Sequence, residues 1–212
     1  MARHYRLKIR AEGLKRTRRR IVEAAVDLHT TVGPAHTTDV AVARRAGVTR
    51  VTLYRHFPDD LSLFQACTEH GLERWPPPDP ETWRRITEPE ARLYVALTQL
   101  YVYYRVAGLG LVVISRDASL LRRELLVSPS RMDILRSMPA VLLRGWKVRG
   151  RRRRLVAAAL NHAVAVRTWQ TLVREQGLAD GDAVELLVGM VLAAHAGDPR
   201  DRTARRAPNA VW

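Results

Sequence analysis

The chain has 212 residues, enough for one large domain or for a small domain joined to a larger one. Hydrophobic residues make up 47% of it, which excludes a wholly disordered chain because a core of useful size can be buried. The 36 Lys and Arg outnumber the 21 Asp and Glu and give a net charge of +15, so we expect a polyanionic partner, either nucleic acid or an anionic membrane surface.

The composition also indicates the cellular compartment. Cys67 is the only cysteine, which excludes an intramolecular disulfide framework and a cysteine-based metal site. The first twenty residues lack the apolar region of a signal peptide. The most apolar stretch, residues 186–196, is roughly half of the ~20 residues that cross a bilayer. We therefore expect a reduced, cytoplasmic protein without a membrane partner.

The N-terminal region is predicted to be helical. Its first dozen residues are basic and weakly patterned, and we expect them to form a mobile arm. A helical period of apolar residues runs from Thr17 to Val32, where Gly33 and Pro34 stop it. Three further helices are predicted, from Thr37 to Gly47, from Thr49 to Phe57 and from Asp60 to Trp75.

A proline-rich break at residues 76–80 separates this region from a second helical region, because each proline fixes φ and lacks a donor. The first helix predicted in this region runs from Thr87 to about Gly108 and Gly110, and a weaker helical stretch continues to Val127. Further helices are predicted from Ser128 to Trp146, from Leu155 to Gln176 and from Asp182 to Ala196, with an arginine-rich turn at 149–154 before the second of these. No β-alternation stands out, so the expected fold class is all-α. The expected domains are residues 1–75, residues 76–197 and a disordered basic tail, 198–212.

Residues 37–58 have the features of a helix-turn-helix. Ala43 is small where two helices must cross, and Gly47 supplies the positive φ of a tight turn. Thr49 is suited to cap the next helix, whose N-terminus then favours a phosphate. The exposed side chains of that helix are polar or basic.

This segment resembles the tetracycline-repressor (TetR) family, whose signature passes through Ala-Gly-Val, a Ser or Thr, and Leu-Tyr-x-x-Phe. The matching residues are AGVT at 46–49 and LYRHF at 53–57. The resemblance implies a dimeric regulator, usually a repressor, that a small ligand releases from an inverted-repeat operator. One position departs from the pattern: Asp60 stands where the family commonly has a Lys that reaches a phosphate.

The resemblance also implies DNA contacts. Base-edge contacts are expected from Arg50, Val51, Thr52 and Arg55, and phosphate contacts from Thr38, Thr49, Tyr54 and His56. The basic run at 15–20 precedes the helix-turn-helix, so Arg18 and Arg19 are expected to attract phosphates as well. The alternative interpretation is a short surface helix beside a buried turn.

A ligand pocket is predicted in the second region. Its candidate lining residues are aromatic or polar: Tyr94, Tyr101, Tyr104, Arg105, Arg116, Trp146 and Trp169. Aromatic side chains on apolar helix faces can equally be ordinary core, and that alternative stays open. The apolar last two helices are expected to form a four-helix interface with a second copy, with an internal core as the alternative.

No enzyme motif or metal-binding spacing occurs, so we expect no enzyme, no cofactor and no metal site. The interpretation that joins these features is a homodimeric, ligand-responsive repressor that binds a double-stranded DNA operator. Two rivals stay open: a constitutive or nucleoid-type DNA-binding protein without an effector, and a basic helical protein that binds membrane surfaces or anionic ligands.

Overall fold

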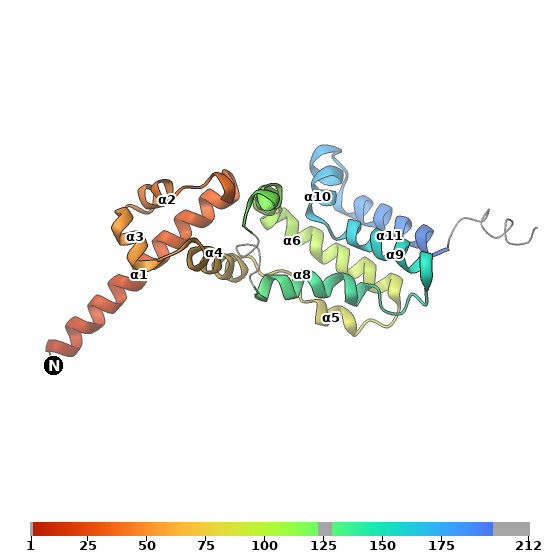
Figure 1. Ribbon diagram of the computed structural model, residues 1–212. Helices are drawn as coiled ribbons and strands as arrows, with labels where there is room; N and C mark the ends of the chain where they lie inside the picture. Colours follow the sequence, from red (N-terminus) through yellow and green to blue (C-terminus); the bar gives the residue numbers. More distant parts are fainter. Residues whose placement is uncertain (1, 123–128, 197–212) are drawn as a thin grey trace, which may run out of the picture. The chain divides into compact units, whose positions relative to one another are not determined.

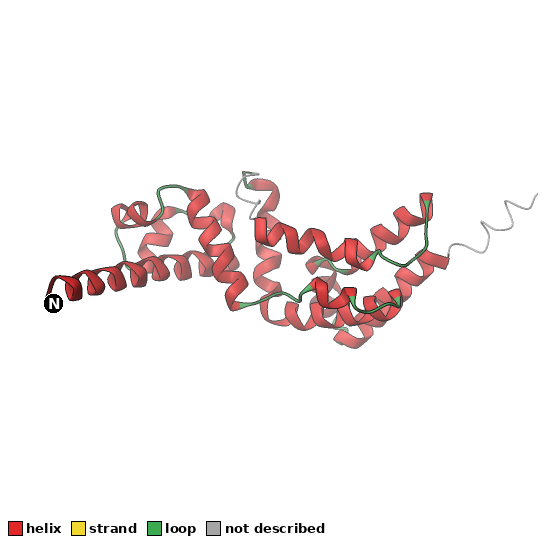
Figure 2. Cartoon of the chain, turned by 90° about the horizontal axis from the view of Figure 1, so that it is seen from below, coloured by secondary structure: helices red, strands yellow, loops and turns green. Residues whose placement is uncertain are grey.

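The computed structural model describes residues 2–122 and 129–196, and every regular element in these ranges is a helix (Figures 1 and 2). The prediction of an all-α fold is confirmed. The chain divides into two compact units, of which the first comprises Met1–Pro77 and Val106–Met132 and the second Pro78–Arg105 and Asp133–Trp212. Each unit therefore contains two separate pieces of the chain.

The first unit contains the helices expected of a helix-turn-helix domain. They are α1 (Ala2–Thr31), η1 (Pro34–His36), α2 (Asp39–Ala46), α3 (Arg50–His56) and α4 (Asp60–Arg74). Helix α1 packs against α2 and α4, and its Ile21 and Ala25 are fully buried in the core together with Leu53 and Phe57. Cys67 lies in the same core, where burial raises the pKa of its thiol to about 12, so the thiol stays protonated.

The prediction of a mobile N-terminal arm is wrong, because α1 begins at Ala2 and continues without a break to Thr31. Lys, Arg, Leu and Glu dominate residues 6–20, and these side chains lose little rotamer freedom in a helix. Gly13 is the one residue of that stretch with a poor helix propensity, and a single glycine is tolerated. The sequence signal was missed because the stretch lacks an apolar period.

The second unit is a bundle built around the first part of α6. Its helices are α5 (Pro80–Arg84), α6 (Pro89–Asp117), α8 (Pro129–Leu142), α9 (Gly150–Ala163), α10 (Val166–Trp169), the π-helix η3 (Gln170–Glu175) and α11 (Asp180–Ala196). Leu93, Leu97 and Leu100 of α6 are buried in its core, and α9 packs against α11. The last part of α6, from Val106, belongs to the first unit, as does η2 (Ala118–Leu120).

Helix α6 does not end at Gly108 and Gly110, as the sequence predicted, but runs through both. A Cβ added to Gly110 would lie 2.8 Å from Cγ2 of Thr30 in α1, so a glycine is needed for the close approach of these two helices. By length and composition alone, Pro89–Leu120 would suffice to cross a membrane, a test that core helices of water-soluble proteins also pass.

A buried arginine fixes the start of α6 in the second unit. Arg92 is 5% exposed and donates five hydrogen bonds, all to main-chain carbonyl oxygens. Its acceptors are Ile86 and Thr87, which precede α6, and Val141 and Arg144 at the end of α8. One side chain thereby supplies donors to carbonyls that precede α6 and to carbonyls at the end of α8.

The long helix predicted from Leu155 to Gln176 is interrupted. Helix α9 ends at Ala163, and the chain then continues as α10 and the π-helix η3. The Tyr104 hydroxyl donates to the carbonyl of Val164 at 2.6 Å, and the Thr168 hydroxyl to that of His162 at 2.6 Å, so the carbonyls freed by the break are satisfied. The arginines expected in a turn at 151–154 lie in the first turns of α9 instead.

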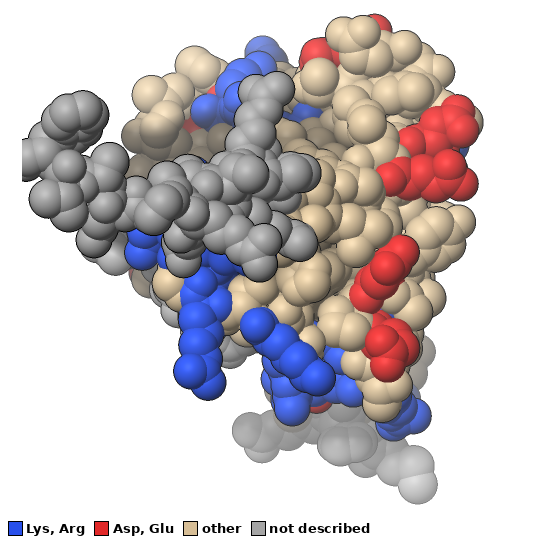
Figure 3. Space-filling model, turned by 90° about the vertical axis from the view of Figure 1, so that its right-hand side faces the viewer, with Lys and Arg blue, Asp and Glu red and all other residues tan. Residues whose placement is uncertain are grey.

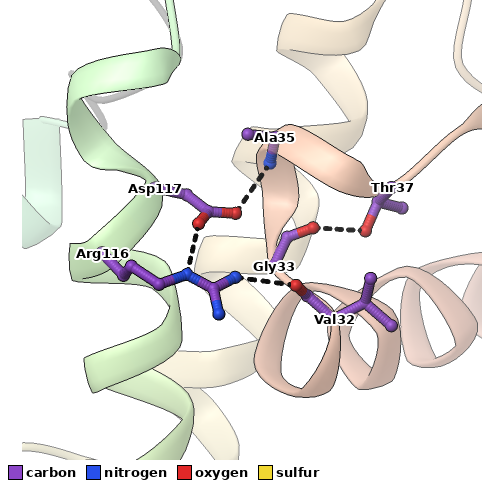
Figure 4. Close-up of polar contacts among 6 residues, drawn as sticks. All are labelled: Val32, Gly33, Ala35, Thr37, Arg116 and Asp117. Carbon is purple, nitrogen blue, oxygen red and sulfur yellow. Dashed lines mark hydrogen bonds and ion pairs between the residues drawn. The ribbon is translucent and has the colours of Figure 1, made fainter.

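The end of α6 is bonded to the turn that follows α1 (Figure 4). The Asp117 carboxylate is 1% exposed; it accepts from the Ala35 amide at 3.2 Å and from Nε of Arg116 at 2.8 Å. Arg116 also donates to the carbonyl of Val32, the residue that follows α1, at 2.9 Å. These donors hold the pKa of Asp117 below its usual value, with the Arg116 hydrogen bond as the largest cause.

Candidate nucleic-acid interface

The turn between α2 and α3 has the geometry that its sequence predicts. Gly47 adopts φ 64° and ψ 41°, the left-handed conformation that glycine takes without a steric penalty. The amide of Val48 then donates to the carbonyl of Ala43 at 2.9 Å, which closes the turn. Ala43 is 3% exposed at the helix contact, and Leu53 anchors α3 in the core. The opposite side of α3 is left free for a partner.

Two threonines cap the helices of this motif. Oγ1 of Thr38 accepts from the amide of Ala41 at the start of α2, and Oγ1 of Thr49 accepts from the amide of Thr52 at the start of α3, each at 3.2 Å. The hydroxyl groups of Thr49 and Thr52 are also bonded to each other at 3.0 Å. Both caps are exposed, so the residues predicted to meet phosphate also fix where each helix begins.

A chain of polar side chains crosses the exposed side of the motif. Arg50 donates to the hydroxyl of Tyr54 at 3.0 Å, and that hydroxyl donates to Oδ2 of Asp39 in α2 at 2.8 Å. The Arg50 guanidinium also lies over the Tyr54 ring, 5.6 Å from its centroid. The residue predicted to read a base and the one predicted to meet a phosphate are therefore joined, and Asp39 sets their position.

The remaining predicted residues of α3 differ in exposure. Val51 and Arg55 are exposed, and Thr52 and His56 are partly buried. Burial, with Arg18 and Arg55 nearby, lowers the pKa of His56, so its imidazole is neutral near pH 7. A contact of His56 with a phosphate therefore uses an N–H group rather than a positive charge.

The two arginines of the basic run have different surroundings. Arg19 is exposed and forms an ion pair with Glu23 at 2.8 Å on the surface of α1. Arg18 instead turns toward α3: it donates to the carbonyl of His56 at 2.9 Å and lies 4.1 Å from the centroid of the Phe57 ring. Arg18 thus satisfies a carbonyl at the end of α3, a role that the sequence did not indicate.

Sequence reasoning missed three further residues here. Arg20 donates to the carbonyl of Gly47 at 3.2 Å and so ties α1 to the turn. Asp39 is the carboxylate that accepts from Tyr54, fifteen residues away. Arg122 pairs with Asp60 at 3.0 Å, so the carboxylate that replaces the family's lysine is neutralised by a residue far along the chain. No local pattern reveals such contacts.

The residues predicted to line a ligand pocket are only partly brought together. Tyr101, Tyr104 and Trp169 form a buried cluster with ring centroids 6.2 and 6.0 Å apart. Arg105 lies near it, in an ion pair with Asp180. Trp146, which follows α8, donates to the carbonyl of Leu142 at the end of that helix and packs on His195. Tyr94 is exposed, and Arg116 belongs to the first unit.

The aromatic cluster contains polar atoms without a partner. The hydroxyl of Tyr101, Nε1 of Trp169 and Oδ1 of Asp180 are buried and form no hydrogen bond. Burial, with the Asp180 carboxylate nearby, raises the pKa of Tyr101 well above its usual value, so its hydroxyl stays protonated and can donate. Within the described ranges, no three His, Cys, Asp or Glu side chains gather in a way that could hold a metal ion.

A known family model matches part of the first unit. The family model described as "Bacterial regulatory proteins, tetR family" matches residues 21–67, which include the core part of α1 and all of α2 and α3. The uncharacterized HTH-type transcriptional regulator TtgW of Pseudomonas putida is 40% identical over 62 residues, 28% of this chain and 46% of that protein. The HTH-type transcriptional regulator SrpR, also of Pseudomonas putida, is 40% identical over 60 residues, 27% of this chain and 28% of that protein. The chain thus matches less than half the length of these relatives.

Solved structures resemble the whole fold at low sequence identity. A TetR-like transcriptional regulator from Rhodococcus sp. RHA1 superposes with a TM-score of 0.61 at 20% identity, covering 86% of this chain and 97% of that one. A tetR-family transcriptional regulator from Streptomyces coelicolor gives 0.58 at 17% identity, covering 92% and 91%. NalD, the secondary repressor of the MexAB-OprM multidrug efflux pump in Pseudomonas aeruginosa, gives 0.57 at 20% identity, covering 86% and 97%. At these identities the likeness shows the fold alone.

Proposed function

We propose that this chain, whose residues 21–67 match the model of the tetR family of bacterial regulatory proteins, is a homodimeric transcriptional repressor that binds an inverted-repeat operator and is released by a small effector. The observation that carries this proposal is the exposed polar side of α3, where Arg50 and Tyr54 are fixed by Asp39. Such a short helix, capped at its start and anchored by its apolar side, suits docking in a major groove.

In this proposal α3 reads the operator. Arg50 and Arg55 donate to guanine O6 and N7, and Thr52 and Val51 contact thymine methyl groups. Phosphates are met by residues on both helices and on α1, namely Thr38, Thr49, Tyr54, His56 and Arg19. Arg18 positions α3, because its guanidinium contacts the His56 carbonyl and the Phe57 ring at the end of that helix.

The proposed dimer forms through the last two helices. Apolar or small side chains are exposed at helical spacing on both: Leu155 and Ala158 on α9, and Leu186, Gly189 and Ala193 on α11. Leu155 and Leu186 are 42% and 54% exposed, so both can contact a partner. On the face that Figure 3 shows, acidic side chains lie mainly along the right-hand edge, and uncharged side chains cover much of the surface beside them. A second copy covering the exposed leucines would bury them.

The proposed effector binds in the second unit at the cluster of Tyr101, Tyr104 and Trp169. Support comes from the unpartnered hydroxyl of Tyr101 and the indole N–H of Trp169, since buried donors without an acceptor cost free energy. A ligand with an aromatic body and an acceptor atom would satisfy them. The π-helix η3 follows Trp169 directly, and such helices are frequent at functional sites.

The test begins by selecting genomic DNA fragments with the purified full-length protein and deriving the operator from those enriched. Arg50→Ala should weaken operator binding by about 1–3 kcal/mol and relax the preference at one base pair. Arg85→Ala, which removes an exposed arginine of the second unit, is the control and should leave binding unchanged. If no fragment is enriched, the protein is not a sequence-specific regulator. If a compound screen finds no ligand that lowers operator affinity, the repressor is constitutive.

A further inference from the structure

Helix α1 continues well beyond the core that it helps to form. Its buried residues begin at Ile21, whereas the described side chains of residues 5–16, here called the α1 extension, are exposed except for the partly buried Gly13. Figure 1 shows this half of α1 running past α2, α3 and α4 without contacting another helix. A helical segment that packs against nothing within its own unit has its whole surface available to a partner.

The extension is strongly basic. It carries Lys8, Arg10, Lys15 and Arg16 against the single acidic residue Glu12. The ion pairs between described residues involve none of these four cations. Their charge is therefore not neutralised by described parts of the protein and is complementary to a polyanion.

One side of the extension faces the same way as the DNA-reading motif. Leu7, Leu14 and Ile21 are seven residues apart, close to two helical turns, so they lie along one stripe of α1. Arg18 follows Leu14 by four residues on the same stripe, and it contacts Phe57 and the His56 carbonyl at the end of α3. The stripe thus faces the side of α1 on which α3 lies.

Basic residues border this stripe on both sides. At 100° per residue, Lys8 and Lys15 fall together on one edge and Arg10 falls on the other. All three lie within about 80° of the direction of Arg18, so they are on the half of α1 that faces the end of α3. Twelve residues of helix extend roughly 18 Å, about the length of five base pairs at 3.4 Å each.

We propose that the α1 extension binds the phosphate backbone of duplex DNA that flanks the half-site read by α3. This rests on the proposed function, because it requires α3 to sit in a major groove. Lys8, Arg10 and Lys15 then add three phosphate contacts outside the operator sequence, and these contacts carry no base preference. The footprint of each subunit is longer than its helix-turn-helix alone would give.

A membrane surface fits the extension less well. Helices that lie on bilayers segregate their apolar residues on one broad side. Here Tyr5 and Ile9 lie on the side of α1 opposite to Leu7 and Leu14, although all four are exposed. Apolar side chains distributed around the helix cannot enter a bilayer surface together.

The test compares two duplexes that contain the selected operator, one ending at the half-site edges and one extended by about ten base pairs of arbitrary sequence on each side. The wild-type protein should bind the extended duplex at least roughly tenfold more tightly. The triple variant Lys8→Gln, Arg10→Gln and Lys15→Gln should bind both duplexes alike and match the wild type on the short one. Its salt slope on the extended duplex should be lower by about 2–3 units. Glutamine keeps the helix propensity, and circular dichroism verifies that α1 is intact.

A charge-matched triple variant in the second unit, Arg84→Gln, Arg85→Gln and Arg174→Gln, is the control and should keep the preference for the extended duplex. Equal binding of both duplexes by the wild type would overturn the role of the extension and leave the proposed function standing. The role of the extension would also be overturned if flanking DNA had no effect on affinity and the protein instead bound vesicles that contain anionic lipid. In that case the first triple variant, but not the control variant, would lose vesicle binding. Failure to bind any duplex would refute the proposed function itself.

Discussion

His29 should make the first unit sensitive to mild acid. It lies on α1 with its ring 5.5 Å from that of Phe64 in α4, and burial lowers its pKa from 6.5 to about 4. Between about pH 6.5 and pH 4, this residue is therefore protonated in the unfolded chain but not in the folded chain. Because a proton favours the unfolded state, stability is present above the unfolded pKa and is lost as the pH falls through that window.

The size of the effect follows from the two pKa values. For one histidine shifted from 6.5 to about 4, the free energy of unfolding should fall by about 2.5 kcal/mol between about pH 7.5 and about pH 4.5. The steepest part should approach ~1.4 kcal/mol per pH unit. Carboxylates with lowered pKa values, such as Asp117, lose their contribution only at lower pH.

Urea denaturation followed by circular dichroism at closely spaced pH values measures this loss, and hydrogen exchange of the α1 and α4 amides assigns it to the first unit. His29→Leu should flatten the profile between about pH 6.5 and pH 4.5, because leucine has no proton to gain. A His29→Leu profile as steep as that of the wild type would refute the argument.

Three further outcomes are expected. Gly33→Ala should lower the free energy of unfolding by about 3 kcal/mol in urea titrations, because φ is +108° and a Cβ would overlap the Asp117 carboxylate; Gly71→Ala, in open helix, should raise it by about 0.5 kcal/mol. Arg92→Met should cost about 3–5 kcal/mol by thermal denaturation, because buried carbonyls lose their donor, and an unchanged midpoint would contradict that role. Tyr54→Phe should weaken operator binding by about 1 kcal/mol in fluorescence anisotropy with stability nearly unchanged; equal affinity would show that the hydroxyl does not position Arg50.

The helix-turn-helix could be predicted from sequence because its determinants are local. Gly47 needs its left-handed conformation, Thr49 caps the helix that follows it, and Leu53 and Phe57 are buried four residues apart. The all-α class followed in the same way from apolar periodicity. The identity of the exposed α3 residues could be predicted for the same reason, since a capped and anchored helix leaves few positions free.

Features fixed by distant contacts were missed. Gly110 was taken for a helix end, but it serves the crossing of α6 with Thr30, eighty residues earlier in the chain. The break after Ala163 lacks Gly and Pro, and the carbonyl it frees is satisfied by Tyr104 from another helix. Arg18 lies over the ring of Phe57, thirty-nine residues away, a contact that the sequence does not indicate. Each of these depends on a tertiary partner that no window of sequence contains.

The bonds between the end of α6 and the turn after α1 limit how the first unit can be recombined with other proteins. A fragment that stops at Pro77 lacks Asp117, so the amide of Ala35 loses its acceptor, and it lacks Arg116, so the carbonyl of Val32 loses a donor. It also lacks Gly110, at which α6 closely approaches Thr30 of α1. The proline-rich segment at 76–80 is therefore a poor junction for a chimaera, even though it looks like a linker. A graft of the first unit onto another protein has to include residues 106–117, or rebuild their contacts in the recipient.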